Sequence, residues 1–457
     1  MEQKIVDENR IQALLDKTKN PPRQTILDIL KKAKEKKGLY LKEAACLVNI
    51  DDPALKQELF NTSGWIKGEI YGERLVFFAP LYISDFCVND CAYCNFHKSN
   101  NTFRRKKLTL EEIGQQTRFL VNMGHKRILL ECGEDPENNN IDYIVEAINK
   151  IYSVRTQKGN IRRVNVNIAA TNVENYRKLK NAKIGTYQLF QETYHRQTYE
   201  KLHCGPKASY DRQITAYGRA FKAGIDDLGL GVLFGLYDWR FEVLALISHA
   251  QYLDKKYGVG PHTISVPRFQ TAPTVGFKPA YPVSDDDFLK LIAILRLAVP
   301  YTGMIISTRE RPAIRKEAFK IGISQASAAS NTTTGGYGKP SGEPQFEIHD
   351  ERRLEEVIRD VLEDNLLPSF CTACYRRGRT GQAFMDLSKP GEIHKFCRPN
   401  GLLTFAEYLS DFANNGFHEK GRALIDFYLA KIEDERLRSE TKRRLDAINK
   451  GERDLYF

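Results

Sequence analysis

Cysteines are the residues of this chain whose spacing indicates chemistry most directly. Cys87, Cys91 and Cys94 form a C-x3-C-x2-C run directly after the apolar stretch 75–83. Three thiolates on one loop can bind three irons of a 4Fe–4S cube and leave the fourth iron open to another ligand. A structural zinc site normally takes four protein ligands, and His97 is close enough in sequence to be the fourth. The spacing therefore favours an iron–sulfur cluster, with zinc as the alternative.

A second set of cysteines lies toward the other end of the chain. Two residues separate Cys371 from Cys374, and Cys397 follows after 22 intervening residues. Three thiolates again favour a 4Fe–4S cluster with one open iron. A zinc ribbon is the alternative here, with His394 as its fourth ligand. Grouped cysteines in the reducing cytosol indicate metal or redox chemistry rather than disulfides.

Apolar runs alternate with amphipathic stretches between the two cysteine sets. The eight runs expected to be strands are Leu75–Ile83, Arg127–Cys132, Val164–Ala169, Thr186–Phe190, Leu228–Phe234, Thr263–Val266, Met304–Ser307 and Ile321–Ser327. The helix-like segments between them include Leu110–Met123, Ile141–Tyr152, Tyr210–Ala223, Phe241–Tyr257 and Asp285–Ala298. Eight such units over about 250 residues predict a closed (β/α)8 barrel. An open doubly wound sheet is the alternative, but its GxGxxG fingerprint after the first strand is missing.

The two ends of the chain predict helices outside the barrel. Residues 1–70 have the apolar spacing of helices, segment 350–364 is expected to be helical, and the tail 405–450 is amphipathic and highly charged. Such tails pack on the outside of a barrel. We therefore predict an α/β protein of three parts. These are an N-terminal helical extension (1–70), a TIM-type (β/α)8 barrel (71–345) and a mostly helical, cluster-binding C-terminal domain (346–457).

Composition limits the function classes. The 457 residues are 42% hydrophobic and 28% charged, which is ordinary for a globular protein. No apolar run approaches the roughly 20 residues of a membrane helix, and the first ten residues lack the apolar core of a secretory signal. The net charge of +11 has no nucleic-acid recognition motif beside it, and its basic tract 104–107 is expected to be solvated. We expect a cytoplasmic protein that binds neither membrane nor nucleic acid.

The residues around the first cysteine set resemble the signature of the radical S-adenosylmethionine (SAM) superfamily. Tyr93 precedes the last cysteine, and the segment 131–134, Glu-Cys-Gly-Glu, ends the second predicted strand where the superfamily has Gly-Gly-Glu. The resemblance implies that SAM chelates the open iron and that Tyr93 contacts its adenine. Gly133 and Glu134 would bind its amino group, although Cys132 replaces the first glycine. Glu192, after the fourth strand, is expected to hold the ribose hydroxyls of SAM or the substrate amine.

Longer segments resemble one family within that superfamily, the tyrosine lyases of FeFe-hydrogenase maturation. The similar segments are 163–171, 190–195, 236–242, 260–268, 299–303 and 369–397, and the last of them contains the second cysteine set. Tyrosine lyases of the thiamine pathway are similar through the barrel but lack these last cysteines. The alternative is therefore a lyase that supplies dehydroglycine to another pathway. A zinc-bearing nucleic-acid-binding protein is the alternative from a different class.

This resemblance implies that L-tyrosine is the substrate and that its Cα–Cβ bond breaks to give p-cresol and dehydroglycine. Dehydroglycine would decay to carbon monoxide and cyanide. A second 4Fe–4S cluster with an additional iron, ligated by L-cysteine, would collect both as an iron–carbonyl–cyanide synthon for assembly of the hydrogenase H-cluster. The implied partners are an electron donor and other hydrogenase maturation proteins.

Two residues at the ends of predicted strands are expected to bind tyrosine. Arg309, after the seventh strand, resembles the family's substrate-binding arginine, and its guanidinium matches a planar carboxylate. A surface ion pair with Glu310 is the alternative. Ser327, on the eighth strand, is the expected polar companion. Relatives tend to have glycine at Ala329, so the loop after this strand departs from the family pattern.

His262 immediately precedes the sixth strand and is therefore expected at the N-terminal end of the barrel, opposite the SAM cluster. Residues there usually stabilise the fold, so a structural role is the alternative. However, the C-terminal domain must cover this end if a channel joins the two clusters, and neutral imidazole suits ferrous iron. We predict that His262 binds the additional iron, with His249 as the second choice.

Overall fold

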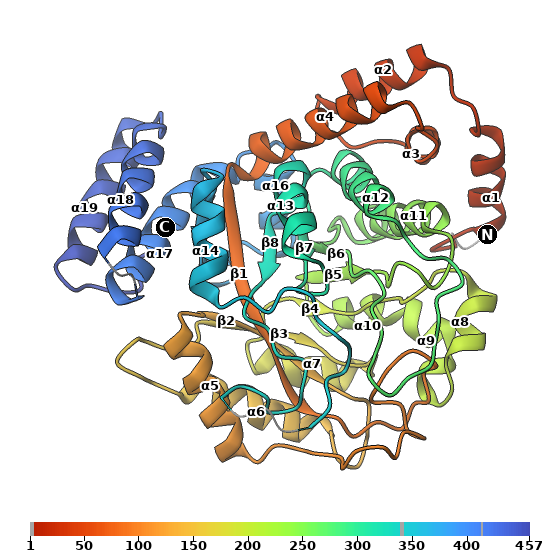
Figure 1. Cartoon of the computed structure of the whole chain (residues 1–457), viewed down its shortest axis with the longest axis horizontal. Helices are drawn as coiled ribbons and strands as arrows, with labels where there is room; N and C mark the ends of the chain where they lie inside the picture. The colour runs from red at the N-terminus through yellow and green to blue at the C-terminus, as the bar shows by residue number, and fades with distance from the viewer. Residues whose placement is uncertain (1–3, 339–341, 413–414) are drawn as a thin grey trace.

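Eight parallel strands close into a barrel (Figure 1) in a computed structural model that describes residues 4–338, 342–412 and 415–457. Each strand pairs with the next in sequence, and β1 pairs with both β2 and β8, which closes the ring. The strands are β1 (Arg74–Ser84), β2 (Arg127–Cys132), β3 (Arg163–Asn167), β4 (Tyr187–Gln188), β5 (Leu228–Gly231), β6 (Thr263–Ser265), β7 (Gly303–Ile306) and β8 (Gln325–Ser327). The predicted (β/α)8 barrel is confirmed, and each of the eight apolar runs overlaps its strand.

Helices cover the outside of the barrel. They are α5 (Leu110–Met123), α6 (Ile141–Ser153), α7 (Val173–Asn181), α8 (Arg196–Leu202), α9 (Tyr210–Ile214), α10 (Ala216–Lys222), α11 (Trp239–Tyr257), α12 (Asp285–Ala298) and α13 (Pro312–Ile321). α5 and α12 have the predicted bounds because each follows an N-cap, Thr109 or Ser284, whose side chain accepts a backbone hydrogen bond from the first turn. The predicted helix 210–223 is divided at Thr215, whose hydroxyl donates to the Asp211 carbonyl at 2.5 Å.

The N-terminal segment is helical, as predicted, and it is part of the core. Its helices are α1 (Glu8–Lys17), α2 (Arg23–Ala33), α3 (Leu41–Leu47) and α4 (Pro53–Tyr71). Leu59, Ile66 and Ile70 on α4 are fully buried, and α4 packs on α12 and α13. A side chain at Gly64 would come within 2.8 Å of the Lys320 carbonyl oxygen. Only glycine therefore allows the two helix backbones to cross this closely.

The C-terminal segment adds a ninth strand that the sequence analysis did not predict. β9 (Leu367–Ser369) pairs in parallel with the first residues of β1, with Arg74 opposite Leu367. The helices here are α14 (Leu354–Glu363), α15 (Ala373–Arg376), α16 (Gly381–Ser388), α17 (His394–Phe412), α18 (Asn415–Ala430) and α19 (Glu435–Asn449). The last three stand beside the barrel in Figure 1. The division at residues 70 and 345 stays a prediction.

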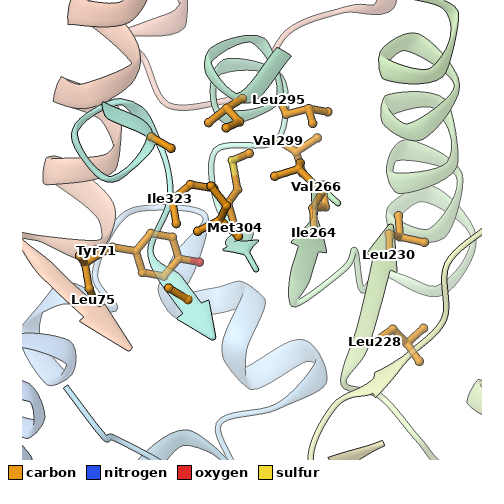
Figure 2. Close-up of a cluster of buried hydrophobic side chains, with 14 of the residues drawn as sticks. Tyr71, Leu75, Leu228, Leu230, Ile264, Val266, Leu295, Val299, Met304 and Ile323 are labelled. Atoms are coloured by element: carbon orange, nitrogen blue, oxygen red, sulfur yellow. The ribbon is translucent and has the colours of Figure 1, made fainter. Parts of the chain in front are cut away.

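The main core lies between the strands and their covering helices. Leu230, Ile264 and Met304 come from consecutive strands, and Leu295 and Val299 come from the end of α12 and the residue after it (Figure 2). Each is at most 2% exposed, and burying such a side chain contributes about 1.5–3 kcal/mol. No helix in the described part of the chain is long and apolar enough to cross a membrane.

A buried ion pair joins the C-terminal segment to the eighth strand. Nη1 of Arg315 on α13 lies 3.0 Å from Asp350 Oδ2, and both side chains are fully buried. Nη2 of Arg315 donates to the backbone carbonyl of Ser327 at 2.6 Å. Burial raises the pKa of Asp350, but Arg352 and Arg315 outweigh burial and hold it below its ordinary value. Asp350 is therefore charged at neutral pH, and its contribution to stability is lost only as the pH falls through this lowered pKa.

Replacing Asp350 with asparagine should lower the free energy of unfolding at pH 7 by about 3 kcal/mol, because Arg315 would stay buried without a countercharge. Urea unfolding would measure the loss. Asp142→Asn is the matched control, since it removes the exposed pair of Asp142 with Lys178 and should cost less than about 1 kcal/mol. Equal losses in the two variants would contradict a stabilising role for the buried pair.

Candidate active site and second cysteine site

The first cysteine loop lies at the C-terminal ends of the barrel strands, where active sites of such barrels are built. Cys87, Cys91 and Cys94 follow β1 and line a cavity of about 210 Å³. Burial raises the pKa of the Cys94 thiol to about 11, and the nearby Cys87 adds to this effect. Burial also raises the pKa of Cys91. A metal or cluster that binds here must therefore displace protons from the thiols.

Arg105 holds this loop in shape. Its Nη1 donates to the carbonyl oxygens of Asp85 and Phe96 at 2.8 and 2.9 Å, and its Nη2 donates to those of His97 and Asn100 at 2.5 and 3.0 Å. Charge-assisted hydrogen bonds of this kind are stronger than neutral ones. The prediction that the tract 104–107 is merely solvated was wrong for Arg105, because these loop carbonyls need a donor.

The fourth ligand that zinc would need at this loop is engaged elsewhere. His97 Nδ1 lies 2.8 Å from Asp90 Oδ1 and 3.1 Å from the Ser99 hydroxyl. Among residues 4–338, 342–412 and 415–457, no three His, Cys, Asp or Glu side chains gather around one ion position. Three cysteines that open on a shared cavity are the donor set that a 4Fe–4S cluster takes.

Tyr93 is fixed beside the cysteines by a histidine. Its hydroxyl lies 2.8 Å from His203 Nε2, and His203 Nδ1 lies 2.7 Å from the Tyr199 carbonyl oxygen. Burial and the nearby Lys207 lower the pKa of His203 to about 4. The ring is therefore neutral, donates from Nδ1 and accepts the Tyr93 proton at Nε2. This hydrogen bond orients the Tyr93 ring on the cavity wall.

The segment after β2 supports the cysteine loop as well as lining the cavity. A side chain at Gly133 would lie 2.3 Å from the Phe86 carbonyl oxygen, so glycine is required by the approach of the cysteine loop itself. Glu134 accepts a hydrogen bond from Asn89 Nδ2 at 2.7 Å and pairs with Arg212 at 2.5 Å. Its carboxylate is thus oriented toward the loop.

Glu192 lines the same cavity from the end of β4 in a backbone conformation that is rare for its type. Its φ is +67°, and its side chain pairs with Lys207 Nζ at 2.7 Å. Burial lowers the pKa of Lys207, but Glu192 and Tyr93 outweigh burial and raise it well above the ordinary value. Left-handed backbone at a cavity wall is the kind of strain that functional sites retain.

Arg309, in the loop after β7, and Ser327, the last residue of β8, line this cavity. The Arg309 guanidinium lies 3.2 Å from the centroid of the Phe346 ring, and Glu310 pairs with Arg268 instead. The alternative of an Arg309–Glu310 ion pair is therefore wrong. In the described residues Arg309 has no carboxylate partner within ion-pair distance. A half-buried guanidinium that lines a cavity without a countercharge is a site for an anionic group of a ligand.

The second cysteine set forms a smaller chamber at the opposite end of the barrel. Cys371 follows β9, Cys374 lies on α15 and Cys397 lies on α17. These residues, with His262 and Arg127 among others, line a chamber of about 40 Å³. Burial raises the pKa of Cys374 to about 12, with Cys397 adding to the effect. The three thiols again match the donors of an iron–sulfur cluster.

His262 lies in this chamber, at the N-terminal end of the barrel. Its ring stacks on Phe384 with centroids 3.8 Å apart. Its Nδ1 is 3.1 Å from Asp227 Oδ2, in a geometry that makes no hydrogen bond. Burial lowers its pKa although Asp227 raises it, so the ring is neutral at pH 7. A neutral imidazole beside three thiols fits an additional metal ion.

The other candidate histidines lie outside both donor sets. His394, the possible zinc ligand, bonds the Gly391 carbonyl oxygen through Nδ1 at 2.6 Å. His249 is buried in α11, where its Nδ1 is 2.8 Å from the Tyr194 hydroxyl. Neither is among the residues that line the second chamber. His262 is thus the histidine that the fold brings to these cysteines.

The chain is similar to known proteins over most of its length. Residues 81–246 match the radical SAM superfamily, and residues 265–367 match the Biotin and Thiamin Synthesis associated domain. The 2-iminoacetate synthase of Salmonella typhimurium is 32% identical over 301 residues, which are 65% of this chain and 78% of that protein. A crystal structure of HydG, a maturase of FeFe-hydrogenase, is 52% identical, with a TM-score of 0.96 over 99% of this chain and 100% of the other.

The chain belongs to the HydG family. The X-ray structure of HydG from Carboxydothermus hydrogenoformans is 40% identical and has a TM-score of 0.85 over 96% of this chain and 97% of that one. The resemblance to the hydrogenase-maturing lyases is therefore confirmed. As a radical SAM enzyme, the chain uses a 4Fe–4S cluster and SAM.

All residues predicted for the two sites line the two cavities. The first cavity has Cys87, Tyr93, Cys91, Cys94, Gly133, Glu134, Glu192, Arg309 and Ser327, and the second has His262, Cys371, Cys374 and Cys397. Their roles stay predictions. Ala329 has a φ of +49°, a left-handed backbone conformation that glycine adopts with less strain than alanine.

Sequence reasoning missed Glu131 as a residue of the first cavity. Its carboxyl accepts a hydrogen bond from Asn167 Nδ2 at 2.9 Å. Burial raises its pKa to about 8, although Asn167 and Arg309 lower it, so it is largely protonated at pH 7. The sequence could have indicated Glu131, because successive side chains of a β-strand point to opposite faces and every second residue of β2 therefore faces the barrel interior. Arg127, Leu129 and Glu131 of β2 all face inward, the first toward the second chamber and the others toward the first cavity.

An apolar layer separates the two cavities inside the barrel. Phe78, Leu129 and Ile305 form a buried cluster of their own and line the floor of the first cavity. Below them, Arg127 lies over the Phe78 ring at 5.2 Å from its centroid and donates to Gln325 Oε1 at 2.7 Å. Arg127 and Gln325 line the second chamber. A short apolar section thus lies between two chemically different ends of the barrel interior.

Proposed function

We propose that this HydG-family chain is a radical SAM tyrosine lyase of FeFe-hydrogenase maturation. It cleaves the Cα–Cβ bond of L-tyrosine to p-cresol and dehydroglycine. The dehydroglycine becomes carbon monoxide and cyanide, which are collected as an iron–carbonyl–cyanide synthon for the hydrogenase H-cluster. The observation that carries this proposal is the pairing of two cysteine-lined cavities at opposite ends of one barrel.

Residues of the first cavity hold the cofactors and the substrate. When bound at Cys87, Cys91 and Cys94, a 4Fe–4S cluster with SAM supplies a 5′-deoxyadenosyl radical. Tyr93 presents its fixed ring to the adenine. Gly133, Glu134 and Glu192 surround the amino group and ribose of SAM. A buried, polar set of this kind orients the cofactor without needing to rearrange.

Tyrosine binds through Arg309 and Ser327. The guanidinium of Arg309 is half-buried, lines the cavity and lacks an ion-pair partner in the described residues, so it recognises the substrate carboxylate with two parallel hydrogen bonds. The Ser327 hydroxyl accepts a hydrogen bond from the Thr308 backbone at 3.2 Å, which leaves its own proton for the substrate. Because the cavity is enclosed by barrel strands, water is kept from reactive fragments.

The second chamber collects the small products. Cys371, Cys374 and Cys397 bind an auxiliary 4Fe–4S cluster, and His262 with L-cysteine binds an additional iron beside it. The apolar layer of Phe78, Leu129 and Ile305 lets a small fragment pass inside the barrel while it hinders solvent ions. An electron donor and other hydrogenase maturation proteins are the partners of this scheme.

Anaerobic reconstitution with SAM, dithionite and L-tyrosine tests the function. The reaction should yield p-cresol, carbon monoxide and cyanide together, and none of them without SAM. Formation of p-cresol without carbon monoxide or cyanide would instead indicate a lyase that acts like the relatives named 2-iminoacetate synthase. A colourless, zinc-containing protein that forms no p-cresol would refute the lyase function.

Replacing Arg309 with lysine should weaken tyrosine binding by about 1.5–3 kcal/mol, because lysine keeps the charge but loses the two-pronged contact. Calorimetric titration of the reconstituted enzyme would measure tyrosine and SAM binding separately, and SAM binding should be nearly unchanged. Arg311→Lys is the matched control, since Arg311 is exposed and pairs with Asp285. A variant that binds tyrosine normally but no longer binds SAM would show that Arg309 contacts the cofactor and not the substrate.

Replacing His262 with alanine should remove the additional iron while both cubes, SAM cleavage and tyrosine cleavage remain. The reason is that His262 is the imidazole in the second chamber. Iron counting and EPR on anaerobically reconstituted protein would show the loss. His249→Ala, which removes a buried histidine outside the chamber, should keep the five-iron signal. An unchanged signal in His262→Ala would leave His262 as a structural residue.

A further inference from the structure

Four residues beyond the last helix lie against the outer side of the second chamber. α19 ends at Asn449, and Gly451 turns the chain with a φ of +103°. We name residues 454–457 the strap. They have no helical or strand structure, and their side chains are half-buried. Such a segment needs specific contacts to keep one position, since it has no backbone ladder of its own.

Asp454 anchors the strap to the cysteine-bearing segment. Its two carboxylate oxygens accept hydrogen bonds from Nη1 and Nη2 of Arg376, both at 2.6 Å. Arg162 Nε lies 2.8 Å from the same carboxylate, and the Asp454 N–H donates to Glu407 at 3.0 Å. These contacts hold Asp454 at a φ of +63°, which a non-glycine residue adopts at some cost.

The two aromatic residues of the strap contact neighbouring arginines. The Arg376 guanidinium lies 3.9 Å from the Tyr456 ring centroid, and that of Arg444 lies 3.9 Å from the Phe457 ring centroid. The Phe457 N–H donates to Asn400 Oδ1 at 2.8 Å, and its carbonyl oxygen accepts from Arg379 at 2.5 Å. The strap therefore joins α15, α17 and α19.

The residues that the strap holds belong to the chamber wall. Asn400 and Phe396 line the chamber, and the Arg379 guanidinium lies 4.4 Å from the Phe396 ring centroid. The Arg379 N–H donates to the Cys374 carbonyl at 2.8 Å. Movement of the strap would thus release the segment 374–379 and one face of α17 together.

We propose that the strap is a displaceable cover of the second chamber, which must lift before the iron-bound product leaves. The nature of that product rests on the proposed function. The outermost contacts suit a cover, because the Asp454–Arg376 ion pair is partly exposed, with Asp454 39% and Arg376 22% exposed, and Arg376 also makes the cation–π contact with Tyr456. Such contacts are individually weak. Leu455 and Phe457 are only partly buried and pack against the edge of the main core, so the strap is a peripheral segment that contains no fully buried side chain.

Iron loss from the reconstituted enzyme tests the cover directly. The full-length protein, loaded with both clusters and SAM but without tyrosine, is challenged anaerobically with a ferrous-iron chelator, and EPR follows the two clusters over time. SAM marks the first cluster by binding its open iron. In Asp454→Asn the auxiliary signal should disappear about tenfold faster, because a charged hydrogen-bonded pair is lost. The rate at the first cluster should not change.

Tyr456→Ala is a second variant that leaves the Asp454 ion pair in place, and it should accelerate auxiliary iron loss about threefold. Asp142→Asn removes an exposed ion pair far from the strap in sequence and should leave both rates unchanged. Wild-type rates in both strap variants would overturn the proposal. Equal acceleration at both clusters would also overturn it, since the strap would then stabilise the whole fold. The assay contains no tyrosine, so failure to form p-cresol in a separate reaction would refute the lyase function and leave this result standing.

Discussion

The parallel pairing of β1 with three other strands holds both cysteine sites in one frame. Its eleven residues extend about 33 Å, and it pairs with β2, β8 and β9. β9 leads directly into Cys371, and the end of β1 leads into Cys87. One strand therefore determines where both sites lie. A shift of this register by one residue would turn the inward side chains outward, so both cavities would be lost together.

The ionisable side chains inside the barrel differ between its two ends. The first cavity has Arg309 without an ion-pair partner in the described residues, beside a Glu131 carboxyl whose pKa burial raises to about 8. The second chamber has Arg127 and His262 beside three thiols. The apolar side chains of Phe78, Leu129 and Ile305 lie between them. A small neutral fragment can cross such a layer far more easily than a hydrated ion, because desolvating a charge is costly.

The sequence predicted most of what depends on local pattern. The strand runs, α5, α12 and both cysteine sets could be predicted because alternation, capping and ligand spacing are local properties. β9 could not, since it has three residues, includes Pro368, and owes its pairing to the start of β1. The predicted strand 321–327 was too long, because Ile321 ends α13 and β8 begins at Gln325.

The roles of several other residues could not be predicted, because they depend on contacts between segments that are distant in sequence. Arg105 stands in a basic tract, and its role depends on four carbonyl groups of a folded loop. Gly133 was assigned to SAM contact alone, while a side chain at this position would also collide with the Phe86 carbonyl oxygen. The roles of Lys207 and of the strap residues could not be predicted, because they depend on contacts with residues distant in sequence. His262 could be placed from its position before β6, because strand direction in a barrel fixes which end a residue occupies.

We propose that one end of the barrel cleaves tyrosine and that the other end collects the fragments. The most direct test compares p-cresol with carbon monoxide in the double variant Cys371→Ser and Cys374→Ser, in one anaerobic reaction with SAM and dithionite. Some p-cresol should still form while the yield of carbon monoxide falls far more, and EPR should show the first cluster intact. Equal loss of both products while that cluster is intact would contradict the division of labour.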